Sequence, residues 1–168
     1  MTLRSYRGRV YQGPDLFETA ADGRTVLCRQ GYVAPSDGGL AYCMRAFDAP
    51  TGRLLWSTEM DTDDSTFIAS EANLVDGVAF YHESQMEEPF GVFVVARNAR
   101  SGKVMWRSRL GTGMGQFRSE WWLRVDPRSK SAPPTYHEGL LYSVTNFGMI
   151  AALDALTGDL LWKNEYDR

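Results

Sequence analysis

The stretch that decides the fold is Asp154-Ala155-Leu156-Thr157-Gly158-Asp159-Leu160-Leu161-Trp162, because the chain contains it in three versions. The other two are Asp48-Ala49-Pro50-Thr51-Gly52-Arg53-Leu54-Leu55-Trp56 and Asn98-Ala99-Arg100-Ser101-Gly102-Lys103-Val104-Met105-Trp106. Counted back from each Trp, Asp or Asn stands at position −8, Ala at −7, Thr or Ser at −5 and Gly at −4, and two apolar residues directly precede the Trp. So many matches in three copies without gaps indicate an internal repeat.

The repeated phrase predicts a strand, a tight turn and a second strand. An Asp or Asn side chain can accept hydrogen bonds from backbone N–H groups two residues further on, and Gly supplies a positive φ. The segments before the turn are apolar and rich in β-formers, as in Val92-Phe93-Val94-Val95-Ala96. The three tryptophans at 56, 106 and 162 are 50 and 56 residues apart. Repeats of this length made of strands are typical of a β-propeller with one four-stranded blade per repeat.

The phrase resembles the signature of the PQQ-type propeller repeat, and the resemblance extends over residues 15 to 166. The third copy is the most similar, whereas the second has Asn98 and Ser101 where the repeat usually has Asp and Thr. This family includes quinoprotein alcohol dehydrogenases and cofactor-free relatives, such as the propeller lipoprotein of the bacterial outer-membrane assembly machinery. The resemblance implies that each Trp packs as a wedge between adjacent blades. We therefore expect structural roles for Asp48, Gly52, Trp56, Asn98, Gly102, Trp106, Asp154, Gly158 and Trp162.

We predict an all-β fold: a β-propeller arc of three four-stranded antiparallel blades that form an incomplete ring. Residues 1–14 would supply a strand of a preceding or incomplete blade, 15–62 blade one, 63–110 blade two, 111–132 an insert and 133–168 blade three. The expected strands are Asp15–Asp22, Thr25–Tyr32, Leu40–Asp48 and Arg53–Met60, then Phe67–Val75, Val78–His82, Gly91–Asn98 and Lys103–Leu110, and finally Thr135–His137, Leu140–Thr145, Met149–Ala155 and Asp159–Glu165.

The insert at 111–132 carries two adjacent tryptophans, Trp121 and Trp122. A segment this long inside a compact domain is either functional or disordered, and paired tryptophans argue against simple disorder. They either cover the edge of a blade, which we favour, or form part of a contact surface. In the second case Arg118 and Arg124 would join them in contacting a partner.

Composition and charge exclude some classes of protein. The chain of 168 residues has a net charge of −3, so it offers no electrostatic basis for binding nucleic acid. No apolar run approaches the ~18 residues of a membrane span. The first nine residues lack the apolar core of a signal peptide. Extracytoplasmic or periplasmic localisation is therefore implied only by the family resemblance.

Acidic and basic residues are unevenly distributed along the chain. Residues 58–88 contain nine acidic residues and no Lys or Arg, whereas residues 100–130 contain eight basic residues and two acidic ones. Such runs are usually solvated faces. The alternative is that they form opposed surfaces that pair with each other or with a partner.

Cys28 and Cys43 are the only cysteines. They lie on the two sides of the turn near Pro35, so they could face each other across a hairpin and form a disulfide. The alternative is that they are two small buried side chains. Two cysteines at this spacing do not form a metal motif.

The sequence signals for metal or cofactor binding are weak. Asp61, Asp63 and Asp64 have the alternating oxygens of a Ca²⁺ loop, but Thr66 and Ala72 stand where such a loop needs Gly and Glu. His82 and His137 each lack a second ligand at metal spacing, which favours structural or surface roles. A quinoprotein site would need a flat quinone and Ca²⁺ on the propeller axis. Three blades cannot close a ring around them, and the adjacent cysteines of many quinoproteins are absent. We expect no catalytic residue and no bound pyrroloquinoline quinone.

The resemblance therefore favours a non-enzymatic propeller scaffold that binds a protein or another ligand through its loops. The alternatives are a fragment of a quinoprotein-like dehydrogenase and a sensor or carbohydrate-binding propeller. A three-blade arc leaves two blade faces bare. Further blades could cover them, which we favour. A second copy could instead close a six-bladed ring, or the N-terminal segment and the insert could cap the ends.

Overall fold

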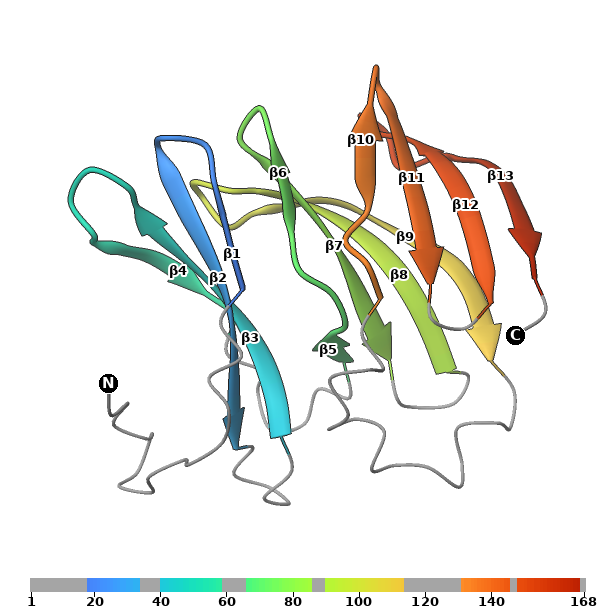
Figure 1. Cartoon of the computed structure of the whole chain (residues 1–168), viewed down its shortest axis with the longest axis horizontal. Helices are drawn as coiled ribbons and strands as arrows, with labels where there is room; N and C mark the ends of the chain where they lie inside the picture. The colour runs from blue at the N-terminus through green and yellow to red at the C-terminus, as the bar shows by residue number, and fades with distance from the viewer. Residues whose placement is uncertain are drawn as a thin grey trace.

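The computed structural model describes residues 18–33, 40–58, 66–85, 90–113, 131–145 and 148–166. In this part of the chain every regular element is a β-strand, and the strands form three separate antiparallel sheets. Figure 1 shows the sheets side by side in chain order, each twisted and each facing the next. Within the same described residues, no helix is long and apolar enough to cross a membrane.

Each sheet is one blade. Blade one contains β1 (Glu18–Ala21), β2 (Thr25–Val33), β3 (Leu40–Asp48) and β4 (Leu54–Ser57). Blade two contains β5 (Thr66–Ile68), β6 (Asn73–Val75), β7 (Val78–Gln85), β8 (Phe90–Asn98) and β9 (Val104–Gly113). Blade three contains β10 (Thr135–His137), β11 (Leu140–Thr145), β12 (Met149–Asp154) and β13 (Leu160–Glu165). The predicted all-β fold with open, four-stranded antiparallel blades is confirmed.

The first strand of blade two differs from its prediction. Phe67–Val75 was expected to form one strand, but two short strands, β5 and β6, pair separately with β7. Between them the Ser70 hydroxyl accepts a hydrogen bond from the backbone N–H of His82 at 2.8 Å. The side chain thereby replaces a backbone carbonyl as the partner of β7, which lets the chain leave the ladder and rejoin it.

All three blades share one register. Trp56 pairs with Ala46, Trp106 with Ala96 and Trp162 with Ala152, and a β-bulge follows each alanine. On the next strand these alanines pair in turn with Leu27, Phe80 and Tyr142. Opposed residues in an antiparallel pair lie on the same face of the sheet. Each blade therefore carries an equivalent row of three side chains on the face that bears its Trp.

Among the described residues, the hydrophobic core consists of two layers, one between each pair of neighbouring blades. The first layer joins blades one and two through Leu27, Met44, Ala46, Ile68, Ala79, Tyr81 and Val95. The second joins blades two and three through Phe80, Val94, Ala96, Leu110, Leu141, Ala151, Leu153 and Ala155. Most of the burial that stabilises the fold therefore depends on contacts between blades.

Cys28 and Cys43 do not face each other, so the disulfide that the sequence left possible does not form. Cys28 pairs with Arg45, and Cys43 pairs with Gln30, so the register between β2 and β3 is offset by two residues from the one assumed. Cys43 is a buried small side chain, as the alternative proposed, and Cys28 is half-buried, which raises the pKa of its thiol.

Candidate functional site

The turn of the repeated phrase has the same backbone hydrogen bonds in all three blades. The N–H of each glycine donates to the carbonyl of the Asp or Asn at position −8, at 2.7 to 2.9 Å. The Asn98 Oδ1 accepts from the backbone N–H groups of Arg100 and Ser101, at 3.1 and 2.8 Å. The three glycines, Gly52, Gly102 and Gly158, have φ values of 69°, 74° and 79°. A left-handed conformation closed by side-chain hydrogen bonds therefore defines each turn.

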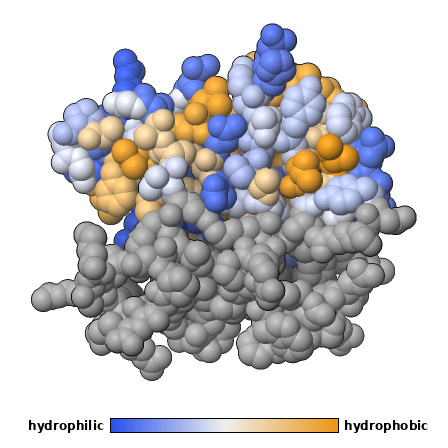
Figure 2. All heavy atoms as spheres, viewed as in Figure 1, coloured by the Kyte–Doolittle hydropathy of each residue, from blue (hydrophilic) through white to orange (hydrophobic). Residues whose placement is uncertain are grey.

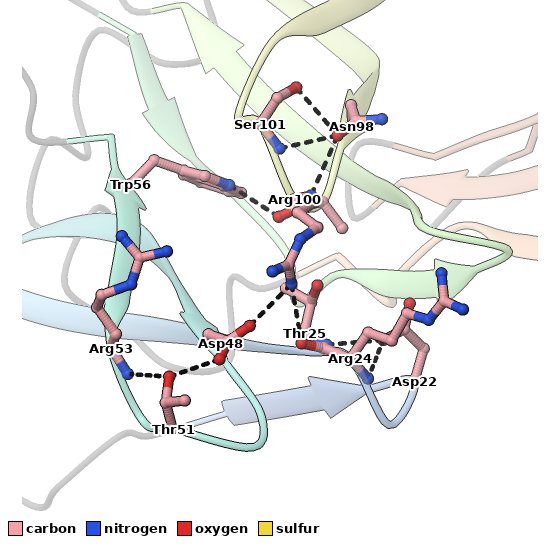
Figure 3. A network of polar contacts seen from close by, with 11 residues as sticks. Asp22, Arg24, Thr25, Asp48, Thr51, Arg53, Trp56, Asn98, Arg100 and Ser101 are labelled. Carbon is pink, nitrogen blue, oxygen red and sulfur yellow. Dashed lines mark hydrogen bonds and ion pairs between the residues drawn. The ribbon is translucent and has the colours of Figure 1, made fainter.

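Each turn receives a tryptophan from the preceding blade. The indole Nε1 of Trp56 in blade one donates to the backbone carbonyl of Ala99 in blade two at 2.8 Å (Figure 3). The indole Nε1 of Trp106 in blade two donates to the carbonyl of Ala155 in blade three at 3.2 Å. The same hydrogen bond therefore joins both pairs of neighbouring blades, and we call it the docking contact.

Two separate structural reasons require glycine at position −4. Besides its positive φ, it lies directly under the docked indole. A Cβ atom on Gly102 would lie 2.7 Å from Trp56 Cγ, and one on Gly158 would lie 2.6 Å from the ring of Trp106. Real Cβ atoms do not approach other atoms so closely, so any side chain here would displace the Trp. Sequence reasoning supplied only the turn requirement.

The alanine at position −7 makes a contact that the sequence did not predict. Its carbonyl accepts the docked indole in Ala99 and Ala155, while its N–H donates to the first turn of its own blade at 2.8 and 2.9 Å. Both alanines are buried. A larger side chain would have little room between the indole and the turn. The signal was present, since Ala stands at this position in all three phrases.

An ion pair adds to the docking contact between blades one and two. Arg100 Nη1 lies 2.9 Å from Asp48 Oδ1, and the Thr51 hydroxyl donates to the other carboxylate oxygen (Figure 3). The Thr51 hydrogen bond, followed by the Arg100 guanidinium, holds the pKa of Asp48 below its usual value. The side chain of Asp48 is thereby stabilised in its charged form.

A buried histidine joins blades two and three. His82 Nε2 lies 2.6 Å from the hydroxyl of Ser143, and both residues are fully buried. Burial lowers the pKa of His82 to about 4, so the imidazole is neutral at neutral pH. A Ser–His pair can act as nucleophile and base only where a substrate can reach it. This pair is inaccessible and serves as an interblade contact. His137, in contrast, is an exposed surface residue.

Among the described residues, the acidic and basic runs of the sequence meet at Glu83 and Arg107. Arg107 on β9 lies 2.9 Å from a carboxylate oxygen of Glu83 on β7, and its guanidinium stacks 3.4 Å above the ring of Phe93. The three side chains lie on one face of blade two. This contact joins one residue of each run within a single blade.

Several candidate residues lie outside the described part of the chain: the possible Ca²⁺ ligands Asp61, Asp63 and Asp64, and the possible partner contacts Trp121, Trp122, Arg118 and Arg124. Among the described residues, no three His, Cys, Asp or Glu side chains gather as a metal site requires. We assign no chemical step to a quinone or to Ca²⁺.

Apolar side chains are exposed on the last strand of every blade. These strands, β4, β9 and β13, are sheet edges. Their exposed apolar residues precede the Trp and have 40 to 54% of their surface accessible: Leu54, Val104, Met105, Leu160 and Leu161. Trp162 itself is 43% exposed, unlike its half-buried counterparts Trp56 and Trp106.

Known proteins share both the repeat and the fold. The dehydrogenase subunit of a quinone-dependent alcohol dehydrogenase of Gluconacetobacter polyoxogenes is 36% identical over 52 residues, which are 30% of this chain and 7% of that protein. BamB from Moraxella catarrhalis has a similar fold, with a TM-score of 0.54 and 18% identity over 89% of this chain and 35% of that one. The quinohemoprotein alcohol dehydrogenase ADHIIG from Pseudomonas putida HK5 has a TM-score of 0.56 and 20% identity over 88% of this chain and 26% of that one.

This chain therefore spans only a minor part of each of these three proteins, between 7% and 35% of their length. The sequence profile of the family described as "Outer membrane protein assembly factor BamB" matches residues 12–118 and 91–168, which together include nearly the whole chain. Because this match agrees with the repeated docking turns and the three-blade arc, the chain belongs to this family of PQQ-like propeller repeats.

Proposed function

We propose that the chain is a non-enzymatic propeller scaffold that binds a protein partner and forms part of a larger propeller. The family's description, an outer membrane assembly factor, supports this function and a place outside the cytoplasm. The repeat residues supply a second argument. In the described blades the Asp or Asn, Ala and Gly of the phrase build the turns, and Trp56 and Trp106 make the docking contacts, so these residues form a structural frame.

The observation that carries the proposal is the row of exposed apolar residues on the edge strands. Val104 and Met105 on β9 and Leu160 and Leu161 on β13 are exposed at equivalent positions, and Leu54 on β4 is their counterpart. Exposed apolar side chains that recur on neighbouring elements are typical of interaction surfaces. An edge strand also offers unpaired backbone groups to an extended partner segment.

The test is to place a charge on this surface. We expect Met105→Glu and Leu161→Glu to abolish partner crosslinking in cells while the folded structure and thermal midpoint stay unchanged. Lys103→Glu is the matched control, because it changes the charge of an exposed residue beside β9 without removing apolar surface. If the crosslinked partner persists in both Glu variants, the edge strands are not the binding surface and this proposal fails.

The second candidate function is part of a quinoprotein-like dehydrogenase. It is favoured by the 36% identity over 52 residues to a quinone-dependent alcohol dehydrogenase subunit. A titration with pyrroloquinoline quinone and Ca²⁺, followed by visible absorbance, separates the two candidates. The scaffold proposal expects no saturable change and no reduction of an electron-accepting dye in the presence of alcohols. Saturable binding with one quinone per ring would favour the dehydrogenase instead.

A further inference from the structure

The two interfaces between blades differ at one buried position. We propose that mild acid opens the interface between blades two and three through protonation of His82, while the interface between blades one and two stays docked. The fold thereby contains a pH-responsive joint at one of these two interfaces. The inference goes beyond the proposed function and does not depend on it, because it concerns contacts between blades of the chain itself.

Arg29 in blade one and His82 in blade two occupy equivalent positions. Each stands two residues after the side chain that pairs with the Ala of its blade's Trp row, which is Leu27 in blade one and Phe80 in blade two. Both lie on the face that packs against the following blade, and 3% and 0% of their surface is accessible. The equivalent buried position therefore holds a permanent cation in the first interface and a titratable imidazole in the second.

The first interface accommodates a positive charge at this position. Arg29 Nη2 donates to the backbone carbonyl of Ile68 in blade two at 3.2 Å. A carbonyl oxygen only accepts hydrogen bonds, and an Arg guanidinium stays protonated in proteins, so this contact is the same at every pH of interest. Acid therefore leaves the charge of Arg29 unchanged.

The second interface is suited to a neutral imidazole. His82 Nε2 lies 2.6 Å from the Ser143 hydroxyl of blade three, and the backbone N–H of His82 donates to Ser70. A hydroxyl can donate to a neutral ring nitrogen, but that donation is lost when the nitrogen is protonated. The surrounding layer is apolar. Burial lowers the pKa of His82 to about 4, and the backbone of Ala132 offsets only part of this effect.

The charged and titratable groups around His82 do not favour its protonated form. On β5, β6, β8, β9, β11 and β12 the residues in register with this face are uncharged. On the facing side of blade three, Tyr136 and Lys163 are titratable, and neither is a carboxylate. Tyr81 and Glu83 lie on the opposite face of blade two, because alternate residues of a strand point to opposite sides. Glu71 follows Ser70 on the adjoining segment, yet the pKa of His82 still lies well below its ordinary value.

Opening this interface separates the docking contact of Trp106. Its Nε1 donates to the Ala155 carbonyl at 3.2 Å, whereas the equivalent hydrogen bond of Trp56 measures 2.8 Å. Some hydrophobic residues already reach the surface of the closed molecule, as the orange spheres in Figure 2 show. Opening adds the buried Phe80 and Leu141 to them. The open form therefore differs from the closed form in exposed apolar surface and in the protection of the Trp106 indole.

The experiment follows hydrogen exchange of the full chain at about pH 7.5 and about pH 5, with rates corrected for the intrinsic effect of pH on exchange. Opening returns His82 to water, where its pKa is the ordinary 6.5, so a falling pH favours the open form. We expect protection of β11, β12 and the Trp106 indole N–H to fall at least about tenfold at the lower pH. Protection of β2, β3 and the Trp56 indole N–H should change by less than about twofold.

Two variants identify the group responsible. His82→Gln keeps a polar side chain without an ionisable ring, so it should remove the effect of acid on β11 and β12. His137→Gln is the matched control and should retain the effect, because His137 is exposed on β10 of the same blade. If His82→Gln does not fold, the imidazole NMR signals of the wild type replace it. The His82 signal should then titrate below pH 6.5, together with the loss of protection in blade three.

Several results would overturn the inference. Protection could stay unchanged in acid, fall equally in blades one and three, or fall in His82→Gln as it does in the wild type. Protonation of His82 while blade three keeps its full protection would also contradict it. None of these results changes the crosslinking and quinone experiments that test the proposed function, so the two proposals can fail separately.

Discussion

Trp56 and Ala99 are 43 residues apart in the chain, yet the indole Nε1 of the first lies 2.8 Å from the carbonyl oxygen of the second. Trp106 and Ala155 repeat the contact at 3.2 Å in the next interface. Each blade buries its Trp-bearing face only against a neighbour, so blade stability and blade order are linked. The predictions below test this linkage.

Two substitutions of Trp56 should separate what its hydrogen bond contributes to the free energy of unfolding from what its packing contributes. Trp56→Phe keeps an aromatic ring but leaves the Ala99 carbonyl without its donor, so we expect a loss of about 1–3 kcal/mol in the free energy of unfolding. Trp56→Ala also removes the ring and should cost about 3–5 kcal/mol. Urea denaturation at low protein concentration measures both. Trp162→Phe is the control and should change stability by less than about 0.5 kcal/mol. Equal losses at Trp56 and Trp162 would contradict the assignment.

Alanine substitutions at Gly102 and Gly77 should separate the stability cost of backbone strain from the cost of a steric clash. Gly102 and Gly77 have φ values of 74° and 76°, so both substitutions impose the same left-handed strain. Only at Gly102 does the new Cβ meet Trp56. We therefore expect Gly102→Ala to lose about 1–3 kcal/mol more than Gly77→Ala, as overpacking of a tight site does. Chemical denaturation of the two variants side by side measures the difference, and equal values would show that the indole can move aside.

The buried His82 should make the fold sensitive to mild acid. Its folded pKa is about 4 against an ordinary value of 6.5, so the unfolded chain binds the proton first as the pH falls. Stability should therefore be unaffected above pH 6.5 and decline by about 3 kcal/mol between pH 6.5 and pH 4. His82→Gln should remove this decline, whereas His137→Gln should retain it because His137 is exposed. A pH series of urea unfolding curves checks both, and a decline that survives in His82→Gln would rule out this origin.

The stabilising contribution of Asp48 should be lost at a lower pH than the contribution of His82. Because its pKa is held below the usual 3.8, its charged form stabilises the fold above that pH, and the contribution disappears as the pH falls through the lower folded value. The thermal midpoint of Asp48→Asn should therefore be lower than that of the wild type at neutral pH, and the difference should shrink in strong acid. High salt should also reduce the difference, since Arg100 is exposed. A difference that is independent of both pH and salt would contradict this account.

The sequence predicted the architecture well where a residue acts through its own turn. The Asp or Asn at −8 and the Gly at −4 signalled the hairpins, because side-chain hydrogen bonds and φ preferences are local properties. The register of β2 and β3 was not predictable from the spacing of Cys28 and Cys43, since pairing depends on how both faces of the blade pack. The division of the first strand of blade two depends on one hydrogen bond between Ser70 and His82, which no periodicity reveals.

By itself the sequence determined the fold class, the number of repeats and the identity of the residues that recur in them, because turn chemistry and alternating strands are set by neighbouring residues. Only the tertiary structure decided what the recurring residues contact. The Ala carbonyl accepts an indole and the Gly lies beneath it only when two blades, encoded about one repeat apart, are brought face to face. The same structure shows that Trp162 is more exposed than Trp56 and Trp106, because burial is a property of neighbours in space and not of neighbours in sequence.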